Sequence, residues 1–236
     1  MMKSAIVLGK GELAIRVSEW FLNDSKHVLR CVVPVVPEPA WSASLGDWAL
    51  DHGVPVVSSG RYQDVDSVMG DGVTFDLGIS VFYDKIIKQR FIDRCGRIFN
   101  IHNGPLPRYR GVSPINWALR NGESEHGVTI HELETGIDTG AIVGQVRFSI
   151  YPEIDEVIDV YRRSLEHAWT LFRHTMPLLE RIVPTPQDDG LATYYSRDMD
   201  KHLGDRRDFT RPQSLAADSH QSPGLDDRVR TREVTA

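Results

Sequence analysis

The sequence predicts an α/β fold whose core is a mostly parallel β-sheet with helices on both faces. Two observations support this prediction. Short apolar runs typical of buried strands alternate along the chain with stretches of helical periodicity, which is the pattern of repeated βα units. The chain also has 236 residues, 41% of them hydrophobic and 25% charged, which suits one full core with a small appendage. We therefore expect a Rossmann-like sheet.

The first part of the chain supplies this alternation. The expected strands are residues 5–8, 27–36, 76–81 and 98–102, and the expected helices are residues 13–22, 45–52 and 84–94. Parallel strands need a long crossover between them, and a helix usually provides it. The strands should therefore lie side by side with their carboxyl ends at one edge of the sheet.

Fewer elements are expected after residue 102. A helix over residues 113–121 should have Ser113 as its N-cap and Pro114 at its first helical position. A long amphipathic helix is expected over residues 154–182, ended by the prolines that follow, and a short C-terminal hairpin over residues 191–197.

The expected organisation is a catalytic domain, an extension that contains the hairpin, and a disordered tail with few large apolar residues. Their limits are residues 1–185, 186–210 and 211–236.

Polar side chains at the end of the strand over residues 98–102 suggest a catalytic site. Side chains alternate along a strand, so Asn100 and His102 share a face, and a segment rich in glycine and proline ends the strand there. Open parallel sheets bind ligands at that end. Asp138 lies in a glycine-flanked turn after a second strand-like run, residues 127–133. An amide, an imidazole and a carboxylate suit transfer of a one-carbon acyl group, although their spacing alone does not select that reaction.

Each of these residues also has a simpler interpretation. A single histidine in a strand is more often packed or exposed, and an aspartate before Thr-Gly is more often a turn former. The shared face of Asn100 and His102, followed by a loop that carries Tyr109 and Arg110, is harder to explain by packing. The combination therefore favours a site.

Several segments between about residue 76 and residue 150 resemble the signature of formyltransferases that use N10-formyltetrahydrofolate. They are Asn100-Ile101-His102, Leu106-Pro107-Arg108-Tyr109-Arg110-Gly111, Pro114-Ile115-Asn116-Trp117-Ala118, Gly127-Val128-Thr129-Ile130-His131 and Asp138-Thr139-Gly140. The resemblance implies that Asn100, His102 and Asp138 are the catalytic trio. An acceptor amine would attack the formyl carbon while Asn100 and protonated His102 stabilise the oxyanion, and Asp138 would keep His102 charged. No metal is required.

The resemblance does not determine which substrate accepts the formyl group. Formylation of methionyl-tRNA would call for an additional C-terminal tRNA-binding domain, and the net charge of −6 disfavours nucleic acid as a partner. Glycinamide ribonucleotide formyltransferases carry a glycine-rich phosphate loop after the first strand. The segment Gly9-Lys10-Gly11 has few glycines for such a loop. Residues 79–87 and 191–197 are similar to the sugar N-formyltransferases. This similarity implies a dTDP-linked amino-dideoxy sugar, and our first choice is dTDP-4-amino-4,6-dideoxyglucose. Glycinamide ribonucleotide formylation and a non-catalytic nucleotide-sugar-binding module stay as alternatives.

Contacts to the two substrates can also be assigned as expectations. Cations and phenol hydroxyls suit a diphosphate, and the candidates for substrate binding are Lys10, Tyr83, Lys85, Tyr109 and Arg110. A flat pterin can be bound by main-chain groups and apolar side chains, and the candidates for folate binding are Ser80, Val81, Phe82, Thr135, Gly136 and Ile137. An NAD site is not expected, because the turn after the first strand lacks the third glycine of the dinucleotide fingerprint.

The remaining features bear on compartment and partners. Cys31 and Cys95 form no CxxC pair, which argues against a zinc site or a disulfide framework and favours a reducing, cytoplasmic setting. The N-terminal apolar run is too short for a signal peptide, and no window is long enough for a membrane span. We expect small-molecule partners, no nucleic acid or membrane, and a homodimer that pairs edge strands near Tyr194.

Overall fold

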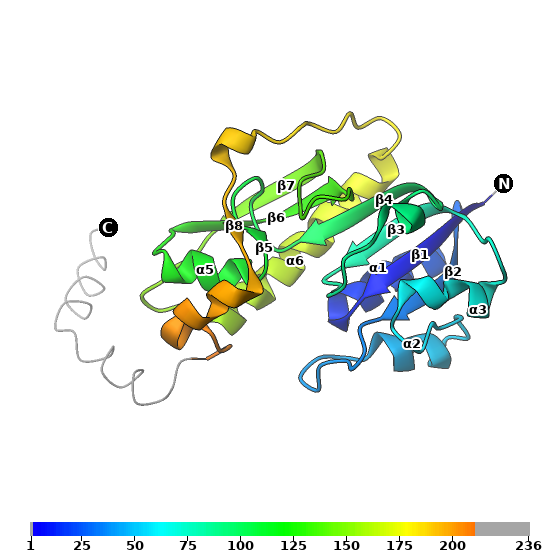
Figure 1. Ribbon diagram of the computed structural model, residues 1–236, viewed down its shortest axis with the longest axis horizontal. Helices are drawn as coiled ribbons and strands as arrows, with labels where there is room; N and C mark the ends of the chain where they lie inside the picture. The colour runs from blue at the N-terminus through cyan, green and yellow to red at the C-terminus, as the bar shows by residue number, and fades with distance from the viewer. Residues whose placement is uncertain (1, 211–236) are drawn as a thin grey trace, which may run out of the picture.

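The computed structural model describes residues 2–210 and contains a six-stranded sheet with the strand order β2-β1-β3-β4-β6-β7 (Figure 1). The four parallel strands are β1 (Lys3–Gly9), β2 (His27–Pro34), β3 (Phe75–Val81) and β4 (Cys95–His102). The two antiparallel strands are β6 (Glu125–Glu132) and β7 (Ile142–Ser149). The expected mostly parallel α/β sheet is confirmed, and β7 is an additional strand that the sequence pattern did not indicate.

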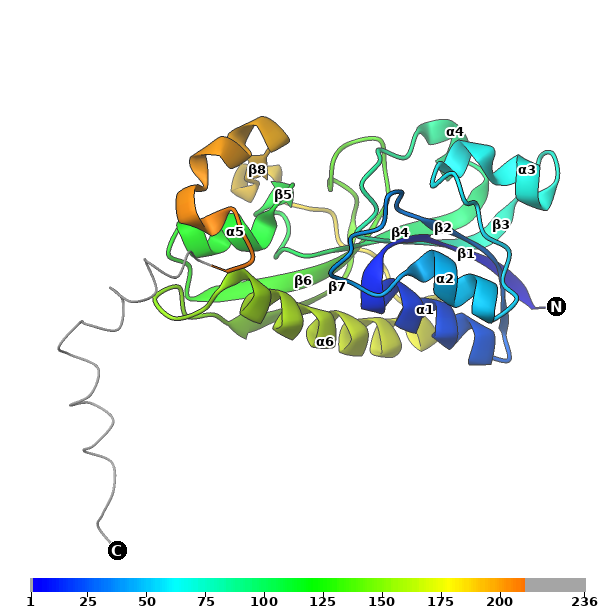
Figure 2. The same cartoon turned by 90° about the horizontal axis from the view of Figure 1, so that it is seen from below.

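Helices cover both faces of the sheet (Figure 2). One face carries α1 (Gly11–Asn23), α2 (Leu45–Asp51) and α6 (Val157–Thr175), and the other carries α3 (Val65–Met69) and α4 (Gln89–Ile92). The alternation in β1 explains this arrangement, because Ala5 and Val7 belong to the core under α1, whereas Ile6 and Leu8 belong to the core on the opposite face.

A third cluster lies at the far end of the sheet, where α5 (Pro114–Arg120) packs near α6. The rings of Trp117 and Tyr195 stack there with centroids 4.5 Å apart. Tyr195 belongs to β8 (Tyr194–Tyr195), which pairs in parallel with β5 (Arg110–Gly111). The expected C-terminal hairpin is therefore wrong: the strand near residue 194 pairs with a segment far away in sequence. The main chain of β5 offers the partners, since the N–H groups of Arg110 and Val112 donate to the carbonyls of Thr193 and Tyr195.

Two helices are shorter than the sequence pattern predicts. The helix expected over residues 84–94 is limited to α4, because the Tyr62 hydroxyl bonds the carbonyl of Ile86 and the N–H of Lys88 and so occupies groups a longer helix would need. The helix expected over residues 154–182 is α6, which begins after a capping box formed by Glu156 and Asp159.

The end of α6 and the start of α5 also differ from expectation. Pro177 has no N–H to continue α6, and Met176–Leu178 form a 3₁₀ turn instead. Pro114 does occupy the first turn of α5, but Ser113 lies in the left-handed region with φ 54° and makes no capping bond. Its hydroxyl bonds Asp200 Oδ2 at 3.2 Å instead.

The expected tail, residues 211–236, lies outside the described residues. Within residues 2–210, no helix combines the length and the apolar character that crossing a membrane requires.

Candidate active site

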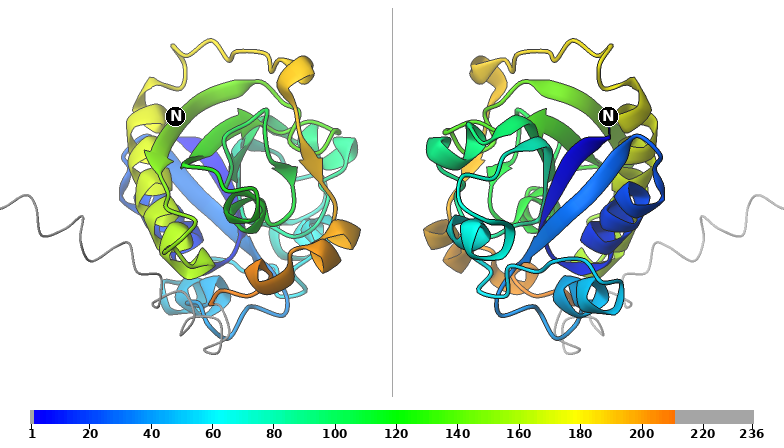
Figure 3. Two further views of the ribbon diagram at one scale, coloured as in Figure 1. Left: turned by 90° about the vertical axis from the view of Figure 1, so that its left-hand side faces the viewer. Right: turned by 90° about the vertical axis from the view of Figure 1, so that its right-hand side faces the viewer.

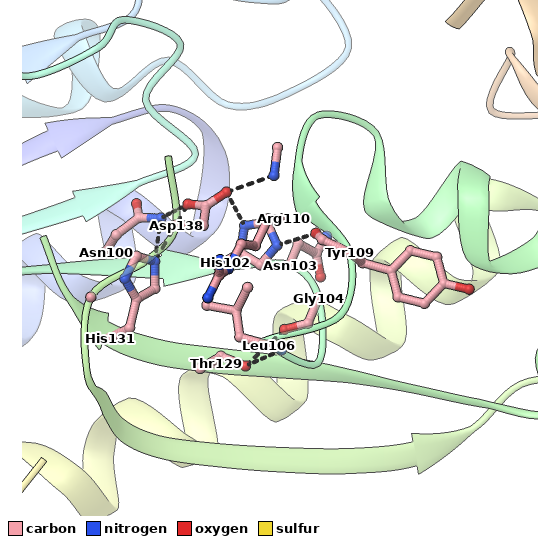
Figure 4. Close-up of polar contacts among 12 residues, drawn as sticks. Asn100, His102, Asn103, Gly104, Leu106, Tyr109, Arg110, Thr129, His131 and Asp138 are labelled. Atoms are coloured by element: carbon pink, nitrogen blue, oxygen red, sulfur yellow. Dashed lines mark hydrogen bonds and ion pairs between the residues drawn. The ribbon is translucent and has the colours of Figure 1, made fainter. Parts of the chain in front are cut away.

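Asn100 and His102 lie at the carboxyl end of β4, and the turn between β6 and β7 brings Asp138 to them (Figure 4). Asn100 Nδ2 is 3.4 Å from Asp138 Oδ1, and His102 Nδ1 is 3.4 Å from Asp138 Oδ2. The alternation expected for this strand places both side chains on one face, as the shared contact with Asp138 shows. The structure therefore brings together the three residues expected to be catalytic.

The Asp138 carboxylate is surrounded by nitrogen atoms of neighbouring residues. The N–H of Gly111 donates to Oδ2 at 2.8 Å, and His131 Nε2 lies 3.5 Å from Oδ1. Burial acts to raise the pKa of Asp138, but the charge of His102, the contacts with His131 and the Gly111 N–H outweigh burial and hold this pKa below its ordinary value. Asp138 is therefore ionised at neutral pH.

His102 has acceptors on both ring nitrogens. Its Nε2 lies 2.7 Å from the carbonyl oxygen of Tyr109, which can only accept, so a neutral His102 carries its proton on Nε2. Burial lowers the pKa of His102, and the charge of Asp138 and the bond to Tyr109 offset this only in part. The expectation that Asp138 keeps His102 protonated is not supported, because desolvation of the ring outweighs the neighbouring charge.

His131 is a site residue that the sequence reasoning did not single out. It lies opposite Asn100 in the antiparallel pairing of β4 with β6, and its Nε2 is 3.1 Å from Asn100 Nδ2. Both hydrogens of the Asn100 amide therefore have acceptors, His131 and Asp138. The contact with Asp138 is the longer one, so an incoming oxyanion can most readily replace it. Only the register between the two strands reveals His131, and the sequence does not contain that register.

These residues open into a cavity of about 590 Å³, a volume typical of small-molecule sites. All but one of the residues expected to contact folate line it: Ser80, Phe82, Thr135, Gly136 and Ile137. The exception is Val81, whose side chain is fully buried in the core and whose carbonyl accepts the N–H of Lys10 at 3.2 Å.

The residues expected to contact the acceptor substrate divide into two groups. Lys10, Tyr83 and Lys85 line the cavity. The side chains of Tyr109 and Arg110 do not. The Tyr109 hydroxyl bonds Glu123 at 2.6 Å, and the Arg110 guanidinium is buried against side-chain acceptors of the C-terminal segment. The structure gives these two residues a role in holding the loop that follows β4.

Arg197 is the second residue that the sequence reasoning missed. It begins the 3₁₀ helix Arg197–His202 and lines the cavity together with Lys10. Burial lowers the pKa of Lys10, the charge of Asp84 opposes this shift, and the charge of Arg197 adds to it. Two cations that repel each other in one cavity provide a favourable position for an anion.

Comparisons with known proteins agree with this geometry. The family model described as formyl transferase matches residues 58–175, which include the whole candidate trio. The chain belongs to the formyl transferase family. This confirms the expected resemblance.

Named relatives are similar over part of their length. A methionyl-tRNA formyltransferase of Synechococcus sp. (strain JA-3-3Ab) is 36% identical over 152 residues, which is 62% of this chain and 47% of the relative. The chain thus spans about half the length of that curated relative.

Two solved structures are 26% identical, with a TM-score of 0.69 and coverage of 84% of this chain. One is the N-formyltransferase from Helicobacter canadensis in complex with folinic acid and dTDP-3-aminofucose, of which 72% is covered. The other is WlaRD, a sugar 3N-formyl transferase, in the presence of dTDP and 5-N-formyl-THF, of which 70% is covered.

Proposed function

We propose that this chain transfers a formyl group from N10-formyltetrahydrofolate to the amino group of a dTDP-linked amino-dideoxy sugar. One observation carries the proposal: Asn100, His102 and an ionised Asp138 meet at the carboxyl end of β4, in a cavity that also exposes Lys10 and Arg197. An acyl-transfer centre and a position for an anion thus share one cavity.

The reaction proceeds through a tetrahedral adduct. The neutral acceptor amine forms a bond to the formyl carbon, the carbonyl electron pair moves to the oxygen, and an N–H of Asn100 stabilises this oxyanion. The buried, neutral His102 accepts the amine proton at Nδ1, since Nε2 already carries a proton, and Asp138 stabilises the imidazolium that results. When the adduct collapses, the bond between carbon and N10 breaks, N10 takes the electron pair, and His102 returns the proton to it.

Different residues of the cavity suit the two substrates. Ser80 lies near the end of β3, Phe82 follows it, and Thr135, Gly136 and Ile137 belong to the turn between β6 and β7; together they provide main-chain groups and apolar cover for a pterin. Lys10, Lys85 and Arg197 suit a diphosphate. The solved relatives named with dTDP or a dTDP-sugar support this choice of acceptor.

We propose dTDP-4-amino-4,6-dideoxyglucose as the acceptor to test first. The two relatives are named for a 3-amino sugar and for a 3N-formyl transferase, so a 3-amino sugar is its direct competitor. Methionyl-tRNA is a second candidate, because a methionyl-tRNA formyltransferase is 36% identical over 152 residues.

The test is an assay of tetrahydrofolate release from N10-formyltetrahydrofolate with each acceptor in parallel. The acceptors are dTDP-4-amino-4,6-dideoxyglucose, dTDP-3-aminofucose, glycinamide ribonucleotide and methionyl-tRNA. Turnover with a dTDP-sugar is expected. Turnover with only glycinamide ribonucleotide or methionyl-tRNA would refute the proposal that the acceptor is a dTDP-sugar. Binding of a dTDP-sugar without turnover would indicate a non-catalytic module.

A further inference from the structure

A single side-chain amide, that of Gln187, joins the turn that holds Asp138 to the loop after β4. Its Nε2 donates to the main-chain carbonyls of Asp138 at 2.8 Å and Gly140 at 2.7 Å. Its Oε1 accepts from Arg110 Nε at 3.1 Å and Nη2 at 2.8 Å. Every hydrogen-bonding group of the amide is therefore engaged by protein groups.

These contacts close a ring around the carboxylate. Arg110 is followed by Gly111, whose N–H donates to Asp138 Oδ2 at 2.8 Å. The main chain of Asp138 is thus tied to Arg110 through Gln187, while its carboxylate is tied to the residue after Arg110. The backbone and the side chain of Asp138 are fixed against the same short strand, β5.

The turn that contains Asp138 needs contacts of this kind to hold its backbone in place. Asp138 has φ 54°, in the left-handed region that a residue with a Cβ adopts at an energetic cost. The turn also lies tight against β6, since a Cβ added at Gly140 would come within 1.8 Å of the carbonyl oxygen of Glu132. Carbonyls in a turn of this kind have no strand or helix partner, and Gln187 supplies partners for two of them.

Gln187 belongs to a strap that runs from the end of α6 to β8, coloured yellow to orange in Figure 3. Thr185 and Ile142 exchange main-chain hydrogen bonds of 2.8 Å at the edge of β7, and Thr193 accepts the N–H of Arg110 at 2.9 Å. Gln187 is therefore held on both sides. The strap lies outside residues 58–175, the segment that the family model matches.

We propose that Gln187 is a positioning residue that sets the Asp138 carboxylate against His102. The proposal rests on the proposed function, because it assigns Gln187 a part in the formyl-transfer step. A displacement of about 1 Å in a catalytic group can slow a reaction about 100-fold, so loss of the tie should act on turnover more than on substrate binding.

Two substitutions separate this role from simple anchoring of the strap. Gln187→Met keeps the length and removes all four hydrogen bonds. Gln187→Glu keeps an acceptor for Arg110 but cannot donate to the carbonyls of Asp138 and Gly140. We expect kcat to fall about 10- to 100-fold in both variants, with both KM values within about threefold of wild type. Full activity in Gln187→Glu and a loss in Gln187→Met would show that only the anchoring matters and would overturn the proposal.

A control and a readout independent of activity complete the test. Asp188→Ala removes a bond to the N–H of Gly190 in the same strap without touching Arg110 or Asp138, and it should leave kcat unchanged. Hydrogen exchange at the Gly111 amide reports whether the carboxylate stays in place even if wild type formylates none of the acceptors tested. Exchange about tenfold faster in Gln187→Met and Gln187→Glu, but not in Asp188→Ala, is expected. Unchanged exchange in both Gln187 variants would contradict the proposal.

Discussion

The parallel and antiparallel halves of the sheet build the candidate site in different ways. In the parallel half, β4 delivers Asn100 and His102 through its own alternation, at the edge where all parallel strands end. In the antiparallel half, Asp138 reaches the same place from an irregular turn whose shape depends on contacts with residues up to 49 positions away. The amide and the imidazole are therefore positioned by the local strand geometry, whereas the carboxylate is positioned by tertiary contacts.

The largest expected effect comes from the locally placed imidazole. His102→Asn removes the proton acceptor and should lower kcat by about 1,000-fold while binding of a dTDP-sugar, measured by calorimetry, changes little. Lys88→Met, an exposed site that does not line the cavity, serves as the control. Turnover that survives in His102→Asn would remove the imidazole from the mechanism.

The second prediction concerns a contact between the two halves. His126 of β6 is fully buried, and its Nε2 lies 3.0 Å from the carbonyl of Asn103, next to His102. Burial lowers the pKa of His126 from 6.5 to about 4. In the unfolded chain the ring takes a proton below pH 6.5, while in the folded protein it stays neutral, so stability must fall as the pH drops.

The expected loss is about 2 kcal/mol of unfolding free energy between pH 6.5 and about pH 5, measured by urea denaturation. Burial also lowers the pKa of His102, which adds to the loss in the same direction. His126→Phe should flatten the profile, and His102→Asn should also flatten it. An equally steep profile in His126→Phe would show that the ring does not titrate as its burial requires.

The smallest expected effect concerns the cations of the cavity. Arg197→Met and Lys10→Met should each raise the KM for the dTDP-sugar about tenfold and leave kcat within about twofold. A phosphate contact that is equally strong in the ground state and in the transition state increases affinity but does not accelerate the reaction. The KM for the folate should not change. A larger effect on the KM for the folate would contradict the assignment of these two cations to the dTDP-sugar.

The parts that the sequence predicted share one physical feature: they depend on neighbours in the chain. The alternation that ends at His102 and the proline at the start of α5 are local signals. Tyr109 and Arg110 were expected to contact substrate, yet their partners are Glu123 in the next loop and Gln187 in the strap. His131 and Arg197 are likewise brought in by strand register and by a distant 3₁₀ helix. No local pattern encodes such contacts.

The carboxylate that the antiparallel half contributes is the central feature of the proposed catalytic centre. Asp138→Asn keeps the shape and an oxygen for the Gly111 N–H but removes the charge beside His102. Single-turnover release of tetrahydrofolate, measured with saturating dTDP-4-amino-4,6-dideoxyglucose, should be about 100-fold slower than in wild type, with the affinity for both substrates retained. An unchanged single-turnover rate would contradict the claim that the two halves of the sheet meet in one catalytic centre.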